Sequence, residues 1–477
     1  MLELLLSLAI VTQDQIPLRG APEENAARHA VLTHGDTLEV RGIKGDYLQV
    51  YDHRRERAGY ILATQAARHE LNAGEAPKLR AVAEFLKNQP GSESLGIAYS
   101  AAFIKAAPAD MIDTGVFEAL GTMADRLALR ASRAGDEKTT RIVSAHMETV
   151  ASYGVSYYSV ERNDKMTICY DGDAWKHVLT RPASSEQKAI AALSITRHDC
   201  VKSTLSPSER LDSDLERAEL LDRVLAESTH DIPEHLRNRL KIRAAGVWAS
   251  AAHRLAIQPD SNPVAVFKAG QKAEEHLAGV NKNTLTANDR NTWNVAAIRV
   301  GASRWAAQPQ TVPQLAKGRP GIWLTKGNPG QTCVQVIPAH SASAQDTPEH
   351  CTYGQIWPAS LSVSPDAKMM TLAVQPLESW RELWVFRLEQ GKWQLEIVPP
   401  STDNPELGYI EFAGWVPGNK QMLVARETVV KGVGKTSFEL WDRDMLRVER
   451  RADHPGSLSA FYRWQDPIWK SGTVAVR

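Results

Sequence analysis

The stretch "GDTLEVRGIKGDYLQV" (35–50) contains Gly-Asp twice, ten residues apart, and each copy leads into an alternating apolar run. Gly and Asp favour turns, and apolar residues with a period of two are typical of half-buried strands. We therefore expect Gly35-Asp36 and Gly45-Asp46 to be the turns of successive hairpins. Short strands with turn residues about every ten positions predict a small β-barrel over residues 11–65.

Several short motifs in this segment resemble the bacterial Src-homology-3-like domain. They are "LRGAP" (18–22), "LEVRG" (38–42), "GDYLQV" (45–50) and "GYI" (59–61). The resemblance implies a protein of the bacterial envelope, or a secreted one, in which this domain binds wall components or protein partners. On that basis the candidate partner-binding residues are Tyr47, Tyr51, Arg54, Arg55 and Tyr60.

The period becomes helical over residues 75–308. Leu211, Leu215 and Leu221 belong to a series of apolar residues in steps of three and four, so we expect them to be buried and Glu216 and Arg217 to be exposed. Start signals such as Ser-Pro-Ser-Glu at 206–209 agree with this period. They predict helices at 208–228, 234–257, 263–279 and 287–307, packed as antiparallel neighbours.

Two features qualify this helical array. The segments "RAAGVWASAA" (243–252) and "VGASRWAAQP" (300–309) are distantly alike. The array therefore resembles the helical hairpins of tetratricopeptide-like proteins, although this sequence shows no fixed 34-residue period. The segment "GVSYYSVERNDKMTICYDG" (154–172) reads as a β-hairpin near 155–170, which turns at Asn163-Asp164.

The last region, 319–477, has a β-like and aromatic composition and holds nine of the 13 tryptophans. Pro365, Pro417 and Pro467 lie 52 and 50 residues apart, and each is expected to start an equivalent strand. The first two precede a strand pattern and then a strand with Trp, and "DPIWKSGTVAVR" (466–477) begins a third copy. These copies resemble the blades of TolB-like and WD-repeat propellers. About 159 residues are too few for a closed propeller, so we expect a partial propeller or a sandwich of blade-like sheets. An oligomer that forms through this domain is also compatible with the pattern.

Trp384 and Trp441 occupy corresponding places in two of these copies. Recurrence at equivalent places predicts that both fill the core. The alternative is a platform on which aromatic rings stack against sugars. The overall prediction is a multidomain α+β chain with three modules, 11–65, 75–308 and 319–477.

Composition narrows the class of partner. The 477 residues include 56 basic and 56 acidic side chains, with no long basic run. Nucleic acid is therefore not expected as a partner. No apolar run reaches 18 residues, so no transmembrane span is expected.

The start of the chain allows two interpretations. The segment "MLELLLSLAI" (1–10) is apolar enough for part of a signal peptide, but it lacks a basic beginning and an Ala-x-Ala cleavage site. Either the signal peptide is incomplete, or this segment is an apolar first strand or short helix.

The four cysteines form two local pairs, Cys169 with Cys200 and Cys333 with Cys351. Two disulfides predict an oxidising compartment, hence a periplasmic or secreted protein. The alternatives are four reduced thiols, or a metal held by Cys333, His340, His350 and Cys351, whose spacing fits no usual site.

Motifs that carry chemistry are weak in this sequence. "KGVGKTS" (431–437) lacks the first glycine of a phosphate loop and is interpreted as a hairpin tip. Ser185-Glu186-Gln187-Lys188 fits Ser-x-x-Lys, but a helix cap at Ser184 or Ser185 explains it. The sequence therefore predicts no catalytic, metal-binding or cofactor-binding residue.

These observations predict a non-catalytic scaffold or adaptor of the bacterial cell envelope, with proteins or peptidoglycan as partners. The alternatives are a cell-wall hydrolase or hydrolase activator, and a carbohydrate-binding protein.

Overall fold

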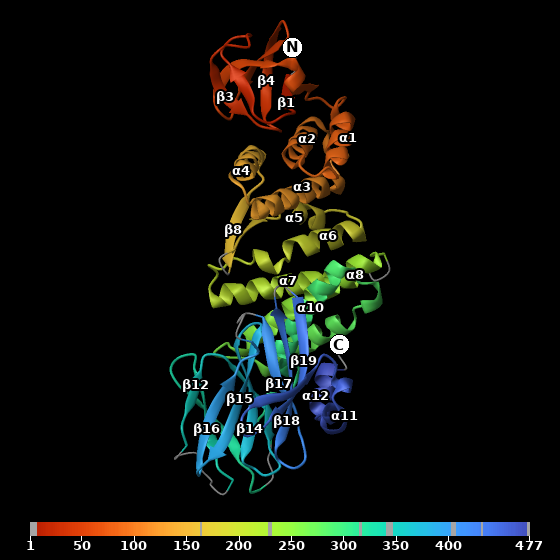
Figure 1. Ribbon diagram of the computed structural model, residues 1–477. Coiled ribbons are helices and arrows are strands. Elements are labelled where there is room, and N and C mark those ends of the chain that lie inside the picture. The colour runs from red at the N-terminus through yellow and green to blue at the C-terminus, as the bar shows by residue number, and fades with distance from the viewer. Residues whose placement is uncertain are drawn as a thin grey trace. The chain divides into compact units, whose positions relative to one another are not determined.

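The computed structural model describes residues 7–162, 165–227, 231–313, 317–339, 347–401, 407–430 and 433–474 (Figure 1). It confirms a mixed α+β chain with an N-terminal sheet, a helical middle and a C-terminal sheet. The chain forms two compact units, Met1–Thr204 and Leu205–Arg477. We call them the N-terminal unit and the C-terminal unit, and the helices of the middle region are divided between them. In the described part of the chain, no helix is both long and apolar enough to cross a bilayer.

The N-terminal unit begins with a seven-stranded sheet of order β3-β2-β6-β5-β4-β1-β7. Its apolar core includes Leu18, Leu38, Leu48, Val50 and Ile61, which alternate with outward residues as the sequence predicts. In the described residues β3 and β7 are unpaired edges, so the sheet does not close into a barrel. The strands are β1 (Ser7–Val11), β2 (Ile16–Arg19), β3 (Arg28–Leu32), β4 (Thr37–Lys44), β5 (Tyr47–Asp52), β6 (Arg57–Leu62) and β7 (Ala66–Glu70).

The two Gly-Asp turns differ, and one prediction about them is wrong. Gly45-Asp46 is a two-residue hairpin turn, because Lys44 pairs with Tyr47 across it. Gly35-Asp36 connects β3 to β4, which are not neighbours in the sheet. Its role is different: the Asp36 carboxylate accepts the Thr33 N–H at 2.8 Å and pairs with arginines of the β5–β6 turn.

In its described residues, the N-terminal unit is completed by six α-helices and a hairpin. The hairpin predicted near 155–170 is confirmed, and its turn at Asn163-Asp164 lies outside the described residues. A disulfide joins Cys169 on the hairpin to Cys200. The elements are α1 (Ala76–Lys87), α2 (Glu93–Ala106), α3 (Thr114–Arg133), α4 (Glu137–Ala151), β8 (Tyr157–Arg162), β9 (Lys165–Tyr170), α5 (Asp173–Thr180) and α6 (Ser185–Ile195).

The C-terminal unit begins with the four helices that the sequence predicts, within a few residues of the expected bounds. Ser206, Asn262 and Thr286 cap three of them through their side chains. They are α7 (Pro207–Glu227), α8 (Glu234–Ala256), α9 (Pro263–Ala278) and α10 (Ala287–Ser303), the last followed by the 3-10 turn η5 (Arg304–Ala307).

The expected burial pattern of α7 is partly wrong. Leu221 is buried and Glu216 exposed as predicted, but Leu211 and Leu215 are only half-buried. Arg217 is only 8% exposed because its guanidinium pairs with Asp214 at 2.7 Å, one turn earlier. A buried arginine with a carboxylate partner does not interrupt an apolar face in the way that an unpaired charge would.

In the described residues, the β region of the C-terminal unit consists of a three-stranded antiparallel sheet and an eight-stranded sheet built from two antiparallel meanders. The three-stranded sheet contains β10 (Gly321–Lys326), β11 (Thr332–Ile337) and β12 (His350–Thr352), and the disulfide Cys333–Cys351 joins its last two strands. The first meander contains β13 (Gln355–Val363), β14 (Met369–Leu377), β15 (Trp380–Glu389) and β16 (Lys392–Val398). The second meander contains β17 (Gly408–Trp415), β18 (Gln421–Val430), β19 (Val433–Asp442) and β20 (Arg447–Ala452). A short parallel pairing of β15 with β17 joins the two meanders.

Apolar layers hold these sheets together. Trp384, on the third strand of the first meander, packs in a layer with Ile322 and Val336 of the three-stranded sheet. Trp441, on the third strand of the second meander, packs in a layer with Leu383 of the first. Both indoles are buried, so the predicted core role is confirmed. Trp384 packs towards the three-stranded sheet and Trp441 towards the first meander, and no closed propeller is present in the described residues.

The prediction of a third copy at Pro467 is wrong. Pro467 lies in a short helix, α12 (Pro467–Trp469), because the Asp466 carboxylate accepts the Ile468 N–H at 2.8 Å and caps it. With α11 (Ser459–Trp464), this segment packs Phe461 and Trp469 on the second meander. The helices therefore cover the last sheet in place of a further strand.

Candidate functional site

Helix α10 lies directly on the second meander. Its Ile298 and Ala302 pack against the ring of Tyr409 on β17. Gly301 is needed at this crossing, because a Cβ there would lie 2.3 Å from the Tyr409 ring. The backbone of α10 and the sheet thus approach closely at one end of the helix.

A buried cluster of charged residues around Glu411 holds this end of α10 against the sheet. The Glu411 carboxylate pairs with Arg304 at 2.7 Å and Arg381 at 2.6 Å, and it accepts the Trp469 indole N–H at 2.8 Å. Burial lowers the pKa of Arg381 to about 10, so the guanidinium stays charged at neutral pH. The cluster ties η5, β15, β17 and α12 together, which positions α10.

The first meander is fastened to the helices by a second charged cluster. Glu378, in the β14–β15 turn, pairs with Arg254 on α8 and with Arg299 on α10 at 2.8 Å, and accepts the Ser250 hydroxyl at 2.6 Å. Burial alone would raise the pKa of Glu378, but the arginines outweigh burial and hold it at about 2.

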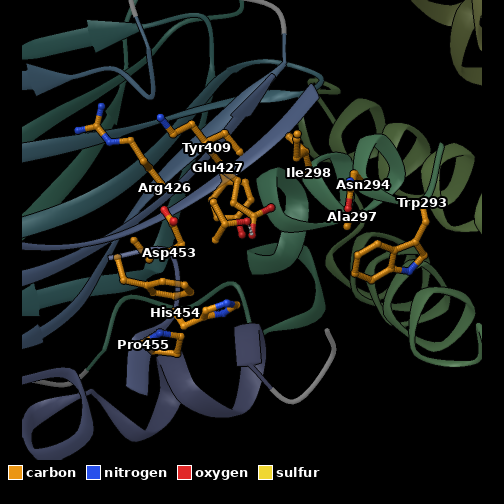
Figure 2. A pocket seen from close by; sticks show the side chains of 15 residues that line it. Trp293, Asn294, Ala297, Ile298, Tyr409, Arg426, Glu427, Asp453, His454 and Pro455 are labelled. Carbon is orange, nitrogen blue, oxygen red and sulfur yellow. Dashed lines mark hydrogen bonds between the residues drawn. The ribbon is translucent and has the colours of Figure 1, made fainter. Parts of the chain in front are cut away.

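Beyond the close crossing, α10 and the second meander enclose a pocket of about 400 Å³, which we call the α10 pocket. Its lining comes from α10, from β17–β19 and from the loop after β20 (Figure 2). The lining residues that carry aromatic rings or functional groups are Trp293, Asn294, Tyr409, Arg426, Glu427, Lys435, Thr436, Phe438, Asp453 and His454.

The α10 pocket combines aromatic surface with acidic groups. Glu427 is only 5% exposed, and the Thr436 hydroxyl donates a hydrogen bond to its carboxylate at 3.1 Å. Asp453 and His454 lie on the exposed loop at the pocket edge. A mostly apolar cavity with a few converging polar groups is typical of a ligand site. Rings and carboxylates together suit a ligand with both apolar faces and hydroxyl donors.

The sequence did not predict this pocket, because its residues are spread over 293–455 and match no motif. The nearest signal was "KGVGKTS" (431–437). Residues 433–437 of this segment belong to β19, which follows β18, and residues 431–432 lie outside the described part. A strand on both sides fits a hairpin and excludes the strand-to-helix context of a phosphate loop. Gly434 has a packing role, since a Cβ there would lie 3.0 Å from Asn294 on α10.

The predicted partner-binding residues fall into two groups. Tyr47 and Tyr51 alternate on β5 with the buried Leu48 and Val50, and Tyr60 lies on neighbouring β6, so the three half-buried rings share the outer face of the sheet. Two cations accompany them: Arg41 lies 4.1 Å from the centre of the Tyr51 ring, and Lys44 lies 5.7 Å from that of Tyr60. We call this surface the tyrosine face.

Arg54 and Arg55 have partners within the fold. Arg54 pairs with Asp36 at 2.9 Å and donates to the Thr149 hydroxyl of α4 at 3.3 Å. Arg55 pairs with Asp36 at 3.0 Å and Asp52 at 2.6 Å. These contacts connect the β5–β6 turn to the rest of the N-terminal unit.

The remaining chemical motifs have structural roles. The predicted pairings Cys169–Cys200 and Cys333–Cys351 are confirmed, and a disulfide leaves no thiolate for a metal at 333 and 351, while His340 lies outside the described residues. The cap interpretation of Ser184 is also confirmed: its hydroxyl accepts the Gln187 N–H, and the Gln187 side chain accepts the Ser184 N–H.

No protein-family model matches this chain, and no curated protein or solved structure is significantly similar to it. A functional proposal therefore rests on the chemistry of the chain's own surfaces.

Proposed function

We propose that the protein is a non-catalytic scaffold or adaptor of the bacterial cell envelope, which binds a protein or cell-wall partner. The tyrosine face carries this proposal. Its rings contribute little to the sheet core, which the opposite side chains of β5 and β6 already fill. Tyr and Arg dominate the energetics of protein interfaces, because they offer large contact area together with polar ends.

The two disulfides support the extracytoplasmic part of the proposal. Such bonds persist in oxidising compartments and are rare in a reducing cytosol. Peptide mapping of protein from its native host, without reductant, tests this point directly. Four free thiols there would contradict a periplasmic or secreted location.

The binding test is co-sedimentation of the full chain with purified peptidoglycan sacculi, together with co-purification of envelope proteins from the native host. Tyr51→Ala and Arg41→Gln should each weaken partner binding at least about tenfold, the loss expected for a hot-spot contact. Tyr462→Ala is the matched control, since this tyrosine on α11 is 79% exposed and outside the tyrosine face. Unchanged binding by both face variants would reject this surface as the partner site.

A second candidate function, carbohydrate binding, is favoured by the α10 pocket. Its three aromatic rings and two carboxylates match the apolar faces and hydroxyl groups of a sugar. Calorimetric titration with soluble peptidoglycan fragments tests it. Asp453→Asn, in an exposed loop, should weaken binding at least about tenfold. Asp260→Asn, on an exposed turn of the same unit, should not.

A further inference from the structure

We propose that a second pocket of the C-terminal unit binds a small oxyanion, a phosphate or a carboxylate group. It lies on the face of β18 and β19 opposite the α10 pocket, and we call it the basic pocket. This inference goes beyond the proposed function, because it does not use the tyrosine face; two of its residues, Arg426 and Lys435, also line the α10 pocket.

Strand alternation places other lining side chains of the two pockets on opposite faces of β18 and β19, while Arg426 and Lys435 line both pockets. On the paired strands, Glu427 lies opposite Thr436 and both line the α10 pocket. The next pair in register, Arg426 opposite Ser437, points to the other face, and Glu439 follows two residues later. In Figure 2 the guanidinium of Arg426 points away from α10, as this alternation requires.

The basic pocket has a volume of about 520 Å³. One wall is the end of β16 and the residues after it, and the other is the charged end of the second meander. Its lining residues are Val398, Pro399, Pro400, Ser401, Arg426, Thr428, Lys435, Ser437, Glu439 and Arg451. The lining therefore holds three cationic side chains and one carboxylate.

That single carboxylate is shared. Glu439 is fully buried, and its oxygens lie 3.3 Å from the Arg426 Nε and 2.9 Å from an Arg451 nitrogen. The same oxygens also accept the Ser437 hydroxyl and the Trp441 indole N–H, each at 2.8 Å. One negative charge thus serves two guanidinium groups.

Arg426 is half-buried, and its Nε has no hydrogen-bond partner in the described residues. Burial lowers the pKa of its guanidinium, Glu439 opposes that effect, and the nearby charge of Arg451 adds to it. One of its terminal nitrogens donates to the Pro400 carbonyl at 2.9 Å, a neutral partner. A bound anion would supply the negative charge that the cluster lacks.

Lys435 completes the site. Its side chain is exposed, lies across the strand pair from Thr428, and within the described residues has no carboxylate at ion-pair distance. Hydroxyl and cationic donors that converge on one cavity favour a phosphate or carboxylate, since charge-assisted hydrogen bonds to oxyanions are the strong ones. A purely structural cluster is a weaker explanation, because buried ion pairs seldom stabilise a fold more than apolar residues would.

The test is thermal unfolding of the full chain with inorganic phosphate or acetate, each compared with chloride at equal ionic strength. A ligand that binds only the folded state raises the melting temperature in a saturable manner. We expect saturable stabilisation by phosphate, by acetate or by both. Phosphate alone points to a phosphate-bearing ligand, and acetate alone or both anions extend the ligand class to carboxylates.

Lys435→Gln and Arg451→Gln should each weaken the apparent affinity about tenfold or more, because each removes a charge-assisted contact. Both side chains are exposed, so the variants should fold. Lys392→Gln, an exposed lysine on β16 outside the pocket, should leave the affinity unchanged. Stabilisation equal to that in chloride, or anion affinity unchanged in both pocket variants, would overturn the proposal.

Discussion

The two meanders share an architecture but differ in the side chains on the face that packs against the preceding strands. On its side facing β10–β12, the first meander is apolar along β14 and β15, with Met370, Leu372, Trp384 and Phe386. On its side facing the first meander, the second is apolar only at one end, with Met422, Val424 and Trp441. At its other end stand Arg426, Lys435, Ser437, Glu439 and Arg451.

This difference separates packing from binding. In the first meander, an apolar layer is sufficient to pack it against the three-stranded sheet. Charged residues at the corresponding layer of the next repeat therefore need another explanation, since their desolvation is costly. We infer that the second meander, with a pocket on each face of β18–β19, is the part of the C-terminal unit specialised for ligands.

The largest expected effect tests the shared packing. Trp384→Ala and Trp441→Ala should each lower the free energy of unfolding by about 3–5 kcal/mol, because each leaves a cavity in an apolar layer. Urea unfolding of the C-terminal unit within the full chain measures both. A loss below about 1 kcal/mol for either variant would break the equivalence of the two repeats.

The stability contributed by the contact between the first meander and the helices should depend on pH. The pKa of Glu378 is about 2 in the folded protein, below its ordinary value of 4.5, so folding favours the ionised form. Its contribution, on the order of 3 kcal/mol, is present above pH 4.5 and is lost as pH falls towards 2. Glu378→Gln should remove this part of the acid sensitivity. An unchanged pH profile in that variant would show that Glu378 does not contribute.

The sheet that covers the first meander is tied by a disulfide, whereas helices cover the second. Replacing Cys333 and Cys351 together by Ser should lower the free energy of unfolding by about 3 kcal/mol, because the bond closes a loop with a sequence separation of 18. Denaturant unfolding measures this loss. An effect within experimental error would mean that the covering sheet is stable without its bond.

The smallest expected effect sharpens the contrast between packing and binding. Lys435→Gln should change the free energy of unfolding by less than about 0.5 kcal/mol without added anion, since its side chain is exposed. The same urea experiment measures it. A loss above about 1 kcal/mol would assign Lys435 to the packing of the meander.

The sequence predicted features that depend on local patterns. The helix cap at Ser206 and the local pairing of cysteines follow from short spacings, and both are present. Arg217 is buried because it pairs with Asp214 one turn away, and Asp214 also pairs with Arg254 on α8. The helical period does not show such partners, so it predicted wrongly that Arg217 is exposed. The Pro467 copy failed because one capping aspartate, Asp466, directs the chain into a helix.

Neither pocket could be predicted in this way. Residues of the α10 pocket belong to a helix, three strands and a loop, and come together only through the close crossing at Gly301 and Tyr409. In the basic pocket, the sequence alone would predict that Arg426 and Glu439 are charged residues on exposed strand faces. Only the strand register shows that they lie on the same face. The tyrosines of β5 and β6 were accessible to sequence reasoning, because alternation alone assigns their face.

The account's central claim is that the protein binds a cell-wall or protein partner without chemical turnover. Its most direct test is a time course with purified sacculi that follows bound protein and released soluble fragments in the same samples. The account predicts saturable binding that Tyr51→Ala weakens, with no release of fragments above the protein-free rate. Fragment release that is lost in Glu427→Gln and Asp453→Asn would contradict it and identify the α10 pocket as the active site of a hydrolase.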